Sequence, residues 1–200
     1  MICANRRAPP RRGRPRDPAI DARILTSALR LFGRTGWSDF SIEKAAKSAD
    51  VSKVTLYLRW RDKTALLIDA LRFAYPPWVV DEARDAAENL AIVVEVMIHE
   101  FTDETGWAVH RALRDPGLPP ELRDCCRKIV ADRLDVLDRL IDANSGPAHR
   151  IDPQLIRKCL IGAAMGEAGD VLLTGRFPSP EEARAFARET VQLILAGSRA

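Results

Sequence analysis

The sequence has no long apolar run. The best candidate, Leu90 to Ile98, is interrupted by Glu95, whereas a helix that spans a bilayer needs roughly 18–20 apolar residues. The basic N-terminus is followed by proline and more arginine, not by the apolar stretch of a secretory signal. We therefore expect a cytoplasmic protein without a membrane partner.

Residues that carry catalysis or bind metals are also scarce. The 3 histidines, His99, His110 and His149, are too widely spaced to ligate one metal ion. A glycine-rich phosphate loop and a Gly-x-Ser-x-Gly nucleophile motif are both absent. The 4 cysteines show no pairing pattern and fit reduced thiols. We expect no enzyme activity, no metal and no cofactor.

No segment alternates apolar and polar residues as a half-buried strand does, so the sequence predicts an all-α protein. Apolar spacing, capping residues and helix-stopping Gly and Pro define nine helices. We expect them at 17–32, 41–49, 52–60, 62–75, 78–103, 106–115, 119–143, 152–174 and from 179 to the end. Residues 17–61 would form a small N-terminal domain, and residues 62–200 a larger helical bundle.

Charge is divided unevenly along the chain. Residues 1–16 contain six arginines and no acid, residues 17–72 carry a net charge of +3, and residues 73–200 carry −6. A basic N-terminal third joined to an acidic remainder indicates that a polyanion binds at the N-terminal end only. Residues 1–16 have almost nothing to bury, and we interpret them as a disordered basic arm.

The first three helices have the layout of a helix-turn-helix, with a tight turn at Asp50-Val51-Ser52 between the second and the third. Asp at this corner tolerates a left-handed backbone. The segment from Asp17 to Leu71 resembles the N-terminal signature of the tetracycline-repressor (TetR/AcrR) family in the order and spacing of its residues. The resemblance rests on Phe32, Gly36-Trp37, Ser41-Ile42, Ala45-Ala46, Ala49 through Ser52, Leu56-Tyr57, Trp60 and Lys63.

Four residues depart from the family pattern. Asp50 and Val54 stand where the family usually has small residues, Leu58 where a polar or aromatic residue is common, and Arg61 where Pro is frequent. The scaffold is unaffected, but Val54 and Leu58 put the usual base contacts in doubt. The resemblance implies a homodimeric regulator of transcription that binds double-stranded operator DNA.

Winding residues 53–61 as a helix places Leu56 and Trp60 inward and Val54 and Leu58 outward. Outward apolar side chains suit the thymine methyl groups of a major groove, although packing on a neighbouring helix is the alternative. Tyr57 is better placed for a phosphate, and Ser41 and Lys63 lie at helix starts that favour anions. Arg59 and Arg61 are either backbone contacts or solvated charge. The candidate DNA contacts in this domain are Ser41, Ser52, Lys53, Val54, Thr55, Tyr57, Leu58 and Lys63.

The arm contains Arg12-Gly13-Arg14-Pro15-Arg16, which resembles the core of minor-groove AT-hooks. Glycine allows close approach, and arginine prefers a narrow, negative groove. Arg12 and Arg14 are therefore further candidate DNA contacts, unless the arm is only a solvated tail.

Two recognition helices are needed to read two half-sites, so we expect a homodimer. Gly162, Gly166 and Gly169 share one helix face and would let another helix approach closely, with Leu193 of the last helix beside them. Close crossing within one subunit is the alternative. The resemblance also implies an interface made by the last two helices.

The resemblance further implies that the central helices surround a cavity for a small-molecule effector, with His99, Phe101, Trp107 and His110 as candidate contacts. Core packing or surface exposure is the alternative for each. Glu167 is either a rim charge or a polar pocket group. The implied mechanism is repression that ends when ligand shifts the fourth helix. A constitutive or protein-regulated DNA binder without an effector is the alternative function.

Overall fold

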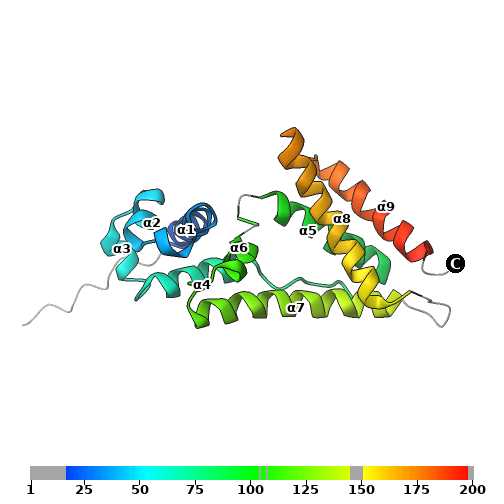
Figure 1. Cartoon of the computed structure of the whole chain (residues 1–200), viewed down its shortest axis with the longest axis horizontal. Coiled ribbons are helices and arrows are strands. Elements are labelled where there is room, and N and C mark those ends of the chain that lie inside the picture. Colours follow the sequence, from blue (N-terminus) through cyan, green and yellow to red (C-terminus); the bar gives the residue numbers. More distant parts are fainter. Residues whose placement is uncertain (1–16, 104, 107, 145–150, 198–200) are drawn as a thin grey trace, which may run out of the picture.

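A computed structural model describes residues 17–103, 105–106, 108–144 and 151–197. Within these ranges every regular element is a helix, which confirms the all-α class, and none of the helices combines the length and apolar character that crossing a bilayer requires. The helices are α1 (Pro18–Asp39), α2 (Ile42–Ser48), α3 (Lys53–Tyr57), α4 (Lys63–Ala74), α5 (Ala86–Thr102), α6 (Ala108–Arg114), α7 (Pro120–Asn144), α8 (Pro153–Thr174) and α9 (Pro180–Gly197) (Figure 1).

Capping residues set most of the helix starts, as the sequence predicts. Asp17 accepts a hydrogen bond from the backbone N–H of Ala19, and Asp62 accepts one from Ala65. At α9, the N–H of Glu182 donates to Ser179 Oγ at 3.2 Å, and the N–H of Ser179 donates to Glu182 Oε2 at 2.8 Å. This reciprocal pair is a capping box, and it supplies acceptors for two otherwise unpaired donors.

The molecule is elongated and has two apolar cores. The first joins α1–α4 to α6 and the start of α7, and the second joins α5, the end of α7, α8 and α9. The long helix α7 runs between the two, with Cys126 in the first core and Ile141 in the second (Figure 1). Because Leu66 and Leu71 of α4 are fully buried in the first core, α4 packs as part of the N-terminal unit although it also contacts α7.

Two expected helices are shorter than their patterns predict. Residues 76–85 are not helical, so the helix expected from residue 78 begins at Ala86. Side chains here bond the backbone in place of helical hydrogen bonds: buried Asn89 donates from Nδ2 to the Asp81 carbonyl at 2.8 Å, and Asp81 accepts from the N–H of Ala83. The α3 helix ends at Tyr57, after which a final turn bond from Trp60 N–H to the Leu56 carbonyl closes the segment.

Two corners of the N-terminal domain require a positive φ angle. Asp50 has φ of 52°, which confirms the left-handed corner expected between α2 and α3. Gly36 has φ of 76° and ψ of −178°, a conformation open essentially to glycine alone, and it interrupts the helical backbone of α1. A Cβ at Gly36 would also lie 3.1 Å from the Arg111 guanidinium of α6.

We expect Gly36→Ala to lower the free energy of unfolding by about 1–3 kcal/mol, because the backbone must either strain or shift. Chemical denaturation measures this change. Gly117→Ala is the control, since Gly117 lacks a positive φ and its Cβ would meet Asp115 Oδ1 only at 3.4 Å. Equal stability of the two variants would contradict the assignment of strain to Gly36.

Tyr75 follows the last turn of α4 and anchors it to the rest of the chain. Its ring is buried, and its hydroxyl donates to the carbonyl oxygens of Thr105 at 2.6 Å and Gly106 at 3.0 Å. Burial raises the pKa of Tyr75 far above its ordinary value, so the phenol remains a donor throughout the neutral range.

We expect Tyr75→Phe to lower the free energy of unfolding by about 1–2 kcal/mol, because it removes a donor from buried carbonyl groups. Tyr57→Phe is the matched control, since half of the Tyr57 side chain is exposed. Thermal melting of both variants would show a clear loss only at position 75. A Tyr75→Phe variant as stable as the wild type would show that the anchor does not depend on this hydroxyl.

Candidate nucleic-acid interface and ligand cavity

The α3 segment presents an apolar face to solvent. Leu56 is fully buried and Trp60 is 6% exposed, whereas Val54 is 58% exposed and Leu58 is 78% exposed. The inward and outward sides predicted from the helical winding are therefore confirmed. Within the described part of the chain, Val54 and Leu58 do not pack on a neighbouring helix, so they remain available to an external surface.

Local hydrogen bonds hold the polar side chains around this face. Ser52 caps α3 by accepting from the Thr55 N–H at 3.2 Å, and the Ser52 and Thr55 hydroxyls lie 2.9 Å apart. Tyr57 donates from its hydroxyl to Glu43 Oε1 of α2 at 2.9 Å, and this hydrogen bond raises the pKa of Tyr57. Lys53 is exposed at the start of the helix. The candidate base contacts Lys53, Val54, Thr55 and Leu58 thus lie on one short element.

Several cations predicted near the DNA have partners within the protein. Lys63 donates from Nζ to the carbonyl oxygens of Trp37 at 3.0 Å and Phe40 at 3.1 Å, and lies 3.8 Å from the centre of the Trp37 ring. Two of its three donors are therefore used to fasten α4 to the end of α1. Arg59 is mostly buried and pairs with Asp21 at 2.6 Å, so it is a structural cation.

Other predicted contacts have simpler positions. Ser41 caps α2 by accepting from the Lys44 N–H at 3.2 Å. Arg61 is 86% exposed and pairs with Asp62. Arg12 and Arg14 lie outside the described residues.

The N-terminal domain is also held by α6. The backbone N–H of Trp37 donates to Asp115 Oδ2 at 3.2 Å, just after the Gly36 corner that lies against Arg111. These contacts are not predictable from local sequence patterns, because residues 37 and 115 are far apart in the chain. They place α6 between the N-terminal helices and the interior of the larger domain.

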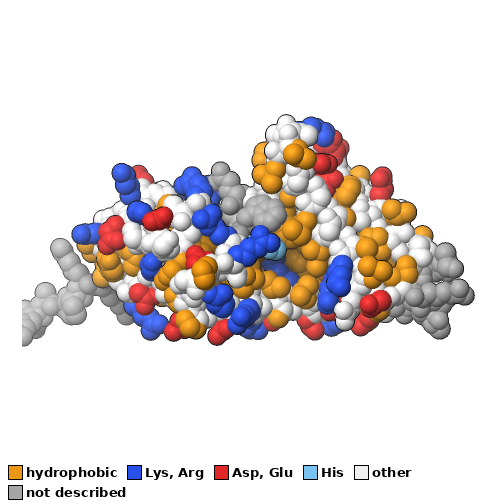
Figure 2. Space-filling model, viewed as in Figure 1, with side chains coloured by type: hydrophobic (Ala, Val, Ile, Leu, Met, Phe, Trp, Pro, Cys, Tyr) orange, Lys and Arg blue, Asp and Glu red, His pale blue; other side chains and the backbone are white. Residues whose placement is uncertain are grey.

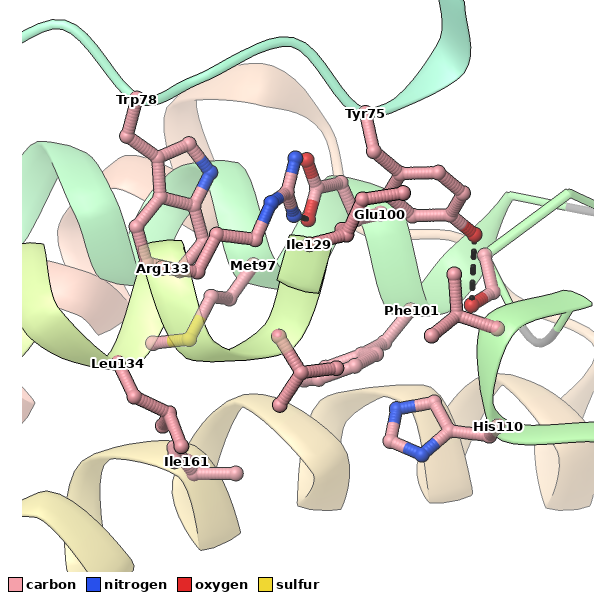
Figure 3. A pocket seen from close by; sticks show the side chains of 13 residues that line it. Tyr75, Trp78, Met97, Glu100, Phe101, His110, Ile129, Arg133, Leu134 and Ile161 are labelled. Carbon is pink, nitrogen blue, oxygen red and sulfur yellow. Dashed lines mark hydrogen bonds and ion pairs between the residues drawn. The ribbon is translucent and has the colours of Figure 1, made fainter. Parts of the chain in front are cut away.

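A cavity of about 120 Å³ lies between α5, α6, α7 and α8 (Figure 3). Phe101 and His110 line it with their ring centres 5.5 Å apart, and burial, assisted by Arg114, lowers the pKa of His110. His99 does not line the cavity, because its half-exposed side chain faces Glu95 at 4.0 Å. Trp107 lies outside the described residues. Most of the wall is apolar, including Met97, Leu134 and Ile161.

One end of the cavity is polar. Arg133 of α7 lies between the rings of Tyr75 and Trp78, 5.0 Å and 4.7 Å from their centres, and forms an ion pair with Glu100 of α5 (Figure 3). The indole Nε1–H of Trp78 is buried and has no acceptor within residues 17–103, 105–106, 108–144 and 151–197. This polar group was not predicted from the sequence, although Arg133 does interrupt the apolar stripe of α7 between Ile129 and Leu137.

The outer face of α8 is open. Gly162 and Gly166 are exposed, and a Cβ at either of them or at Gly169 would meet nothing within 4 Å. The alternative of a close helix crossing at these glycines within one subunit is therefore wrong. Exposed apolar side chains continue the face, and Figure 2 shows hydrophobic groups gathered over this end of the molecule. They include Leu155, Leu172, Leu173, Phe177 and Leu193.

Glu167 lies on the same helix. It is partly buried, and burial beside Asp170 and Glu182 raises its pKa. It is not part of the cavity wall, so it is a rim charge at the open face rather than a pocket group. Among the described residues no cluster of three or more His, Cys, Asp or Glu side chains is arranged to hold a metal ion.

Comparison with known proteins agrees with the geometry of the N-terminal domain. Residues 24–70 match the model of the bacterial regulatory proteins of the tetR family. The HTH-type transcriptional regulator YdeS of Bacillus subtilis is 38% identical over 60 residues, which are 30% of this chain and 30% of YdeS. The fatty acid metabolism regulator protein of the same organism is 24% identical over 148 residues, which are 70% of this chain and 76% of that protein. The HTH-type regulator YuxN matches over 40% of its length, so the chain spans well under half of YdeS and YuxN.

Solved structures share the fold of most of the chain. The regulator FadR of Bacillus subtilis in complex with stearoyl-CoA superposes with a TM-score of 0.64 at 19% identity, over 88% of this chain and 97% of that one. A TetR-family transcriptional regulator of Streptomyces coelicolor gives 0.58 at 18% identity, over 92% of each chain. The N-terminal domain therefore matches the tetR family of bacterial regulatory proteins, and most of the chain shares the fold of solved TetR-family regulators.

Proposed function

We propose that this protein is a homodimeric transcriptional repressor that binds operator DNA through α3 and releases it when a small apolar ligand enters the cavity. The exposed face of α3 carries the proposal. A side chain such as Leu58, at 78% exposure, is costly in water but favourable against thymine methyl groups in a major groove. The hydroxyl of Tyr57 lies beside this face and can exchange Glu43 for a backbone phosphate.

Dimerisation is the geometric requirement for reading two half-sites. The open face of α8 and α9 suits it, because exposed glycines allow close helix approach and the surrounding leucines supply apolar area. A twofold axis at this face would place the two α3 helices on the same side of the dimer.

The chemical class of the ligand is proposed from the residues that line the cavity. The wall is mostly apolar, and it includes Tyr75, which caps the C-terminal end of α4. A sequence relative in Bacillus subtilis is described as a fatty acid metabolism regulator protein, and the similar solved structure of FadR from that organism is in complex with stearoyl-CoA. A ligand with an acyl chain is therefore the first class to test. Filling the cavity would displace Tyr75 and move α4, and with it the spacing of the recognition helices.

Selection from random duplexes, followed by binding measurements with the recovered operator, tests DNA recognition. We expect Leu58→Ala to weaken operator binding by about 1–3 kcal/mol and to relax discrimination at one base pair. Val79→Ala is the control, because Val79 is 90% exposed and lies outside the helix-turn-helix. Recovery of no preferred duplex would refute the proposed function.

The dimer is tested separately by sedimentation. We expect Gly166→Trp to shift the protein toward monomer, since an indole would separate two helices that meet at this glycine. The isolated subunit should still fold, because a Cβ at Gly166 meets nothing within 4 Å. Arg127→Trp, at a 66% exposed side chain of α7, is the control and should leave the association unchanged. A dimer that survives Gly166→Trp would place the interface elsewhere.

A further inference from the structure

The polar end of the cavity contains a donor that has no acceptor among the described residues. Trp78 Nε1–H is buried at the wall and makes no hydrogen bond to the described part of the chain. A buried donor left unpaired is destabilising, and a bound group that accepts its hydrogen bond recovers that free energy. Because Trp78 Nε1 has almost no accessible surface, a ligand atom that accepts hydrogen bonds can reach it only when the wall around the indole shifts, and the end of the cavity near Trp78 is then suited to such an atom.

The charge at the same end is already balanced. The side chain of Arg133 is 11% exposed, and its guanidinium is occupied by Glu100 and by the Pro76 carbonyl at 3.3 Å. Asp103 adds a further negative charge close enough to act on Tyr75. An anionic head group would meet Glu100 in a region of low dielectric, where repulsion between like charges is strong.

These two observations together select among ligand head groups. We infer that the cavity prefers an apolar molecule whose head is a neutral carbonyl, such as an ester, thioester or amide, over a free carboxylate. The carbonyl oxygen accepts from Trp78 Nε1–H, and the apolar part lies along Met97, Phe101 and Leu134 (Figure 3). Glu100 is the counterion of Arg133 within the protein, and it therefore disfavours the binding of a carboxylate to Arg133. This inference rests on the proposed ligand site and adds the chemical class of its ligand.

The experiment compares two probes with the same chain, N-methyldecanamide and decanoate, by isothermal titration calorimetry at neutral pH. We expect the wild type to bind the amide at least about tenfold more tightly than the acid. Trp78→Phe should weaken amide binding by about three- to tenfold, because it keeps an aromatic ring and removes the donor.

Glu100→Gln is the decisive variant, since it removes the counterion and keeps a side chain of the same shape. We expect it to raise the affinity for decanoate by about tenfold or more and to leave that for the amide nearly unchanged. Glu88→Gln is the matched control on the same helix, because Glu88 is half exposed, pairs with Arg84 and lies outside the cavity. Thermal melting of each variant checks that it is folded.

Three outcomes would overturn the inference: decanoate binding the wild type as tightly as the amide, Glu100→Gln leaving the ratio unchanged, or neither probe binding. Each is distinguishable from failure of the proposed function, which is measured with the operator in the same preparations. A protein that binds its operator but shows one of these outcomes remains a DNA-binding regulator with a different ligand chemistry. A protein that binds no duplex fails as a regulator whatever its preference among head groups.

Discussion

The anchoring of Tyr75 is the contact on which the proposed coupling of the two halves depends. Its hydroxyl holds the carbonyl groups of Thr105 and Gly106 in the link between α5 and α6, and its ring lies on the Arg133 guanidinium of α7. The same residue ends α4, whose other end is fastened at Lys63 to the backbone of the N-terminal domain. One helix therefore has its first residue in the domain proposed to read DNA and its last contact in the cavity wall.

A second connection runs through α6. His110 faces the cavity, while the next residue, Arg111, lies against the Gly36 corner, and Asp115 accepts the Trp37 N–H. Because α4 and α6 both contact the end of α1, the N-terminal domain is attached to the rest of the chain at two points. Ligand-linked coupling between distant sites is typically about 1–3 kcal/mol. Breaking or shifting contacts of this kind, each involving charged or buried groups, is sufficient to supply a change of that size.

The sequence predicted the elements that depend on local rules and missed those that depend on contacts across the chain. The capped starts at Asp17 and Ser179, the left-handed corner at Asp50 and the outward side of α3 all follow from short-range patterns, and all are confirmed. The expected helix from residue 78 was wrong because Asn89, eight residues after Asp81, bonds its backbone. His99 was placed in the cavity by its helix alone, and the helical phase turns it outward toward Glu95.

The polar end of the cavity shows why ligand chemistry is hardest to foresee. Arg133, Glu100 and Trp78 come from three separate segments of the chain, and their effect on ligand binding depends on the contacts that they make in the folded protein. A lone arginine in the α7 stripe predicts an anion site, because its positive charge would be costly without a partner. Because Arg133 is already paired with Glu100, the site disfavours a second anion. The unpaired indole donor of Trp78 is then its dominant polar feature. The preference of a buried site therefore follows from its residual charge and unsatisfied groups rather than from any single side chain.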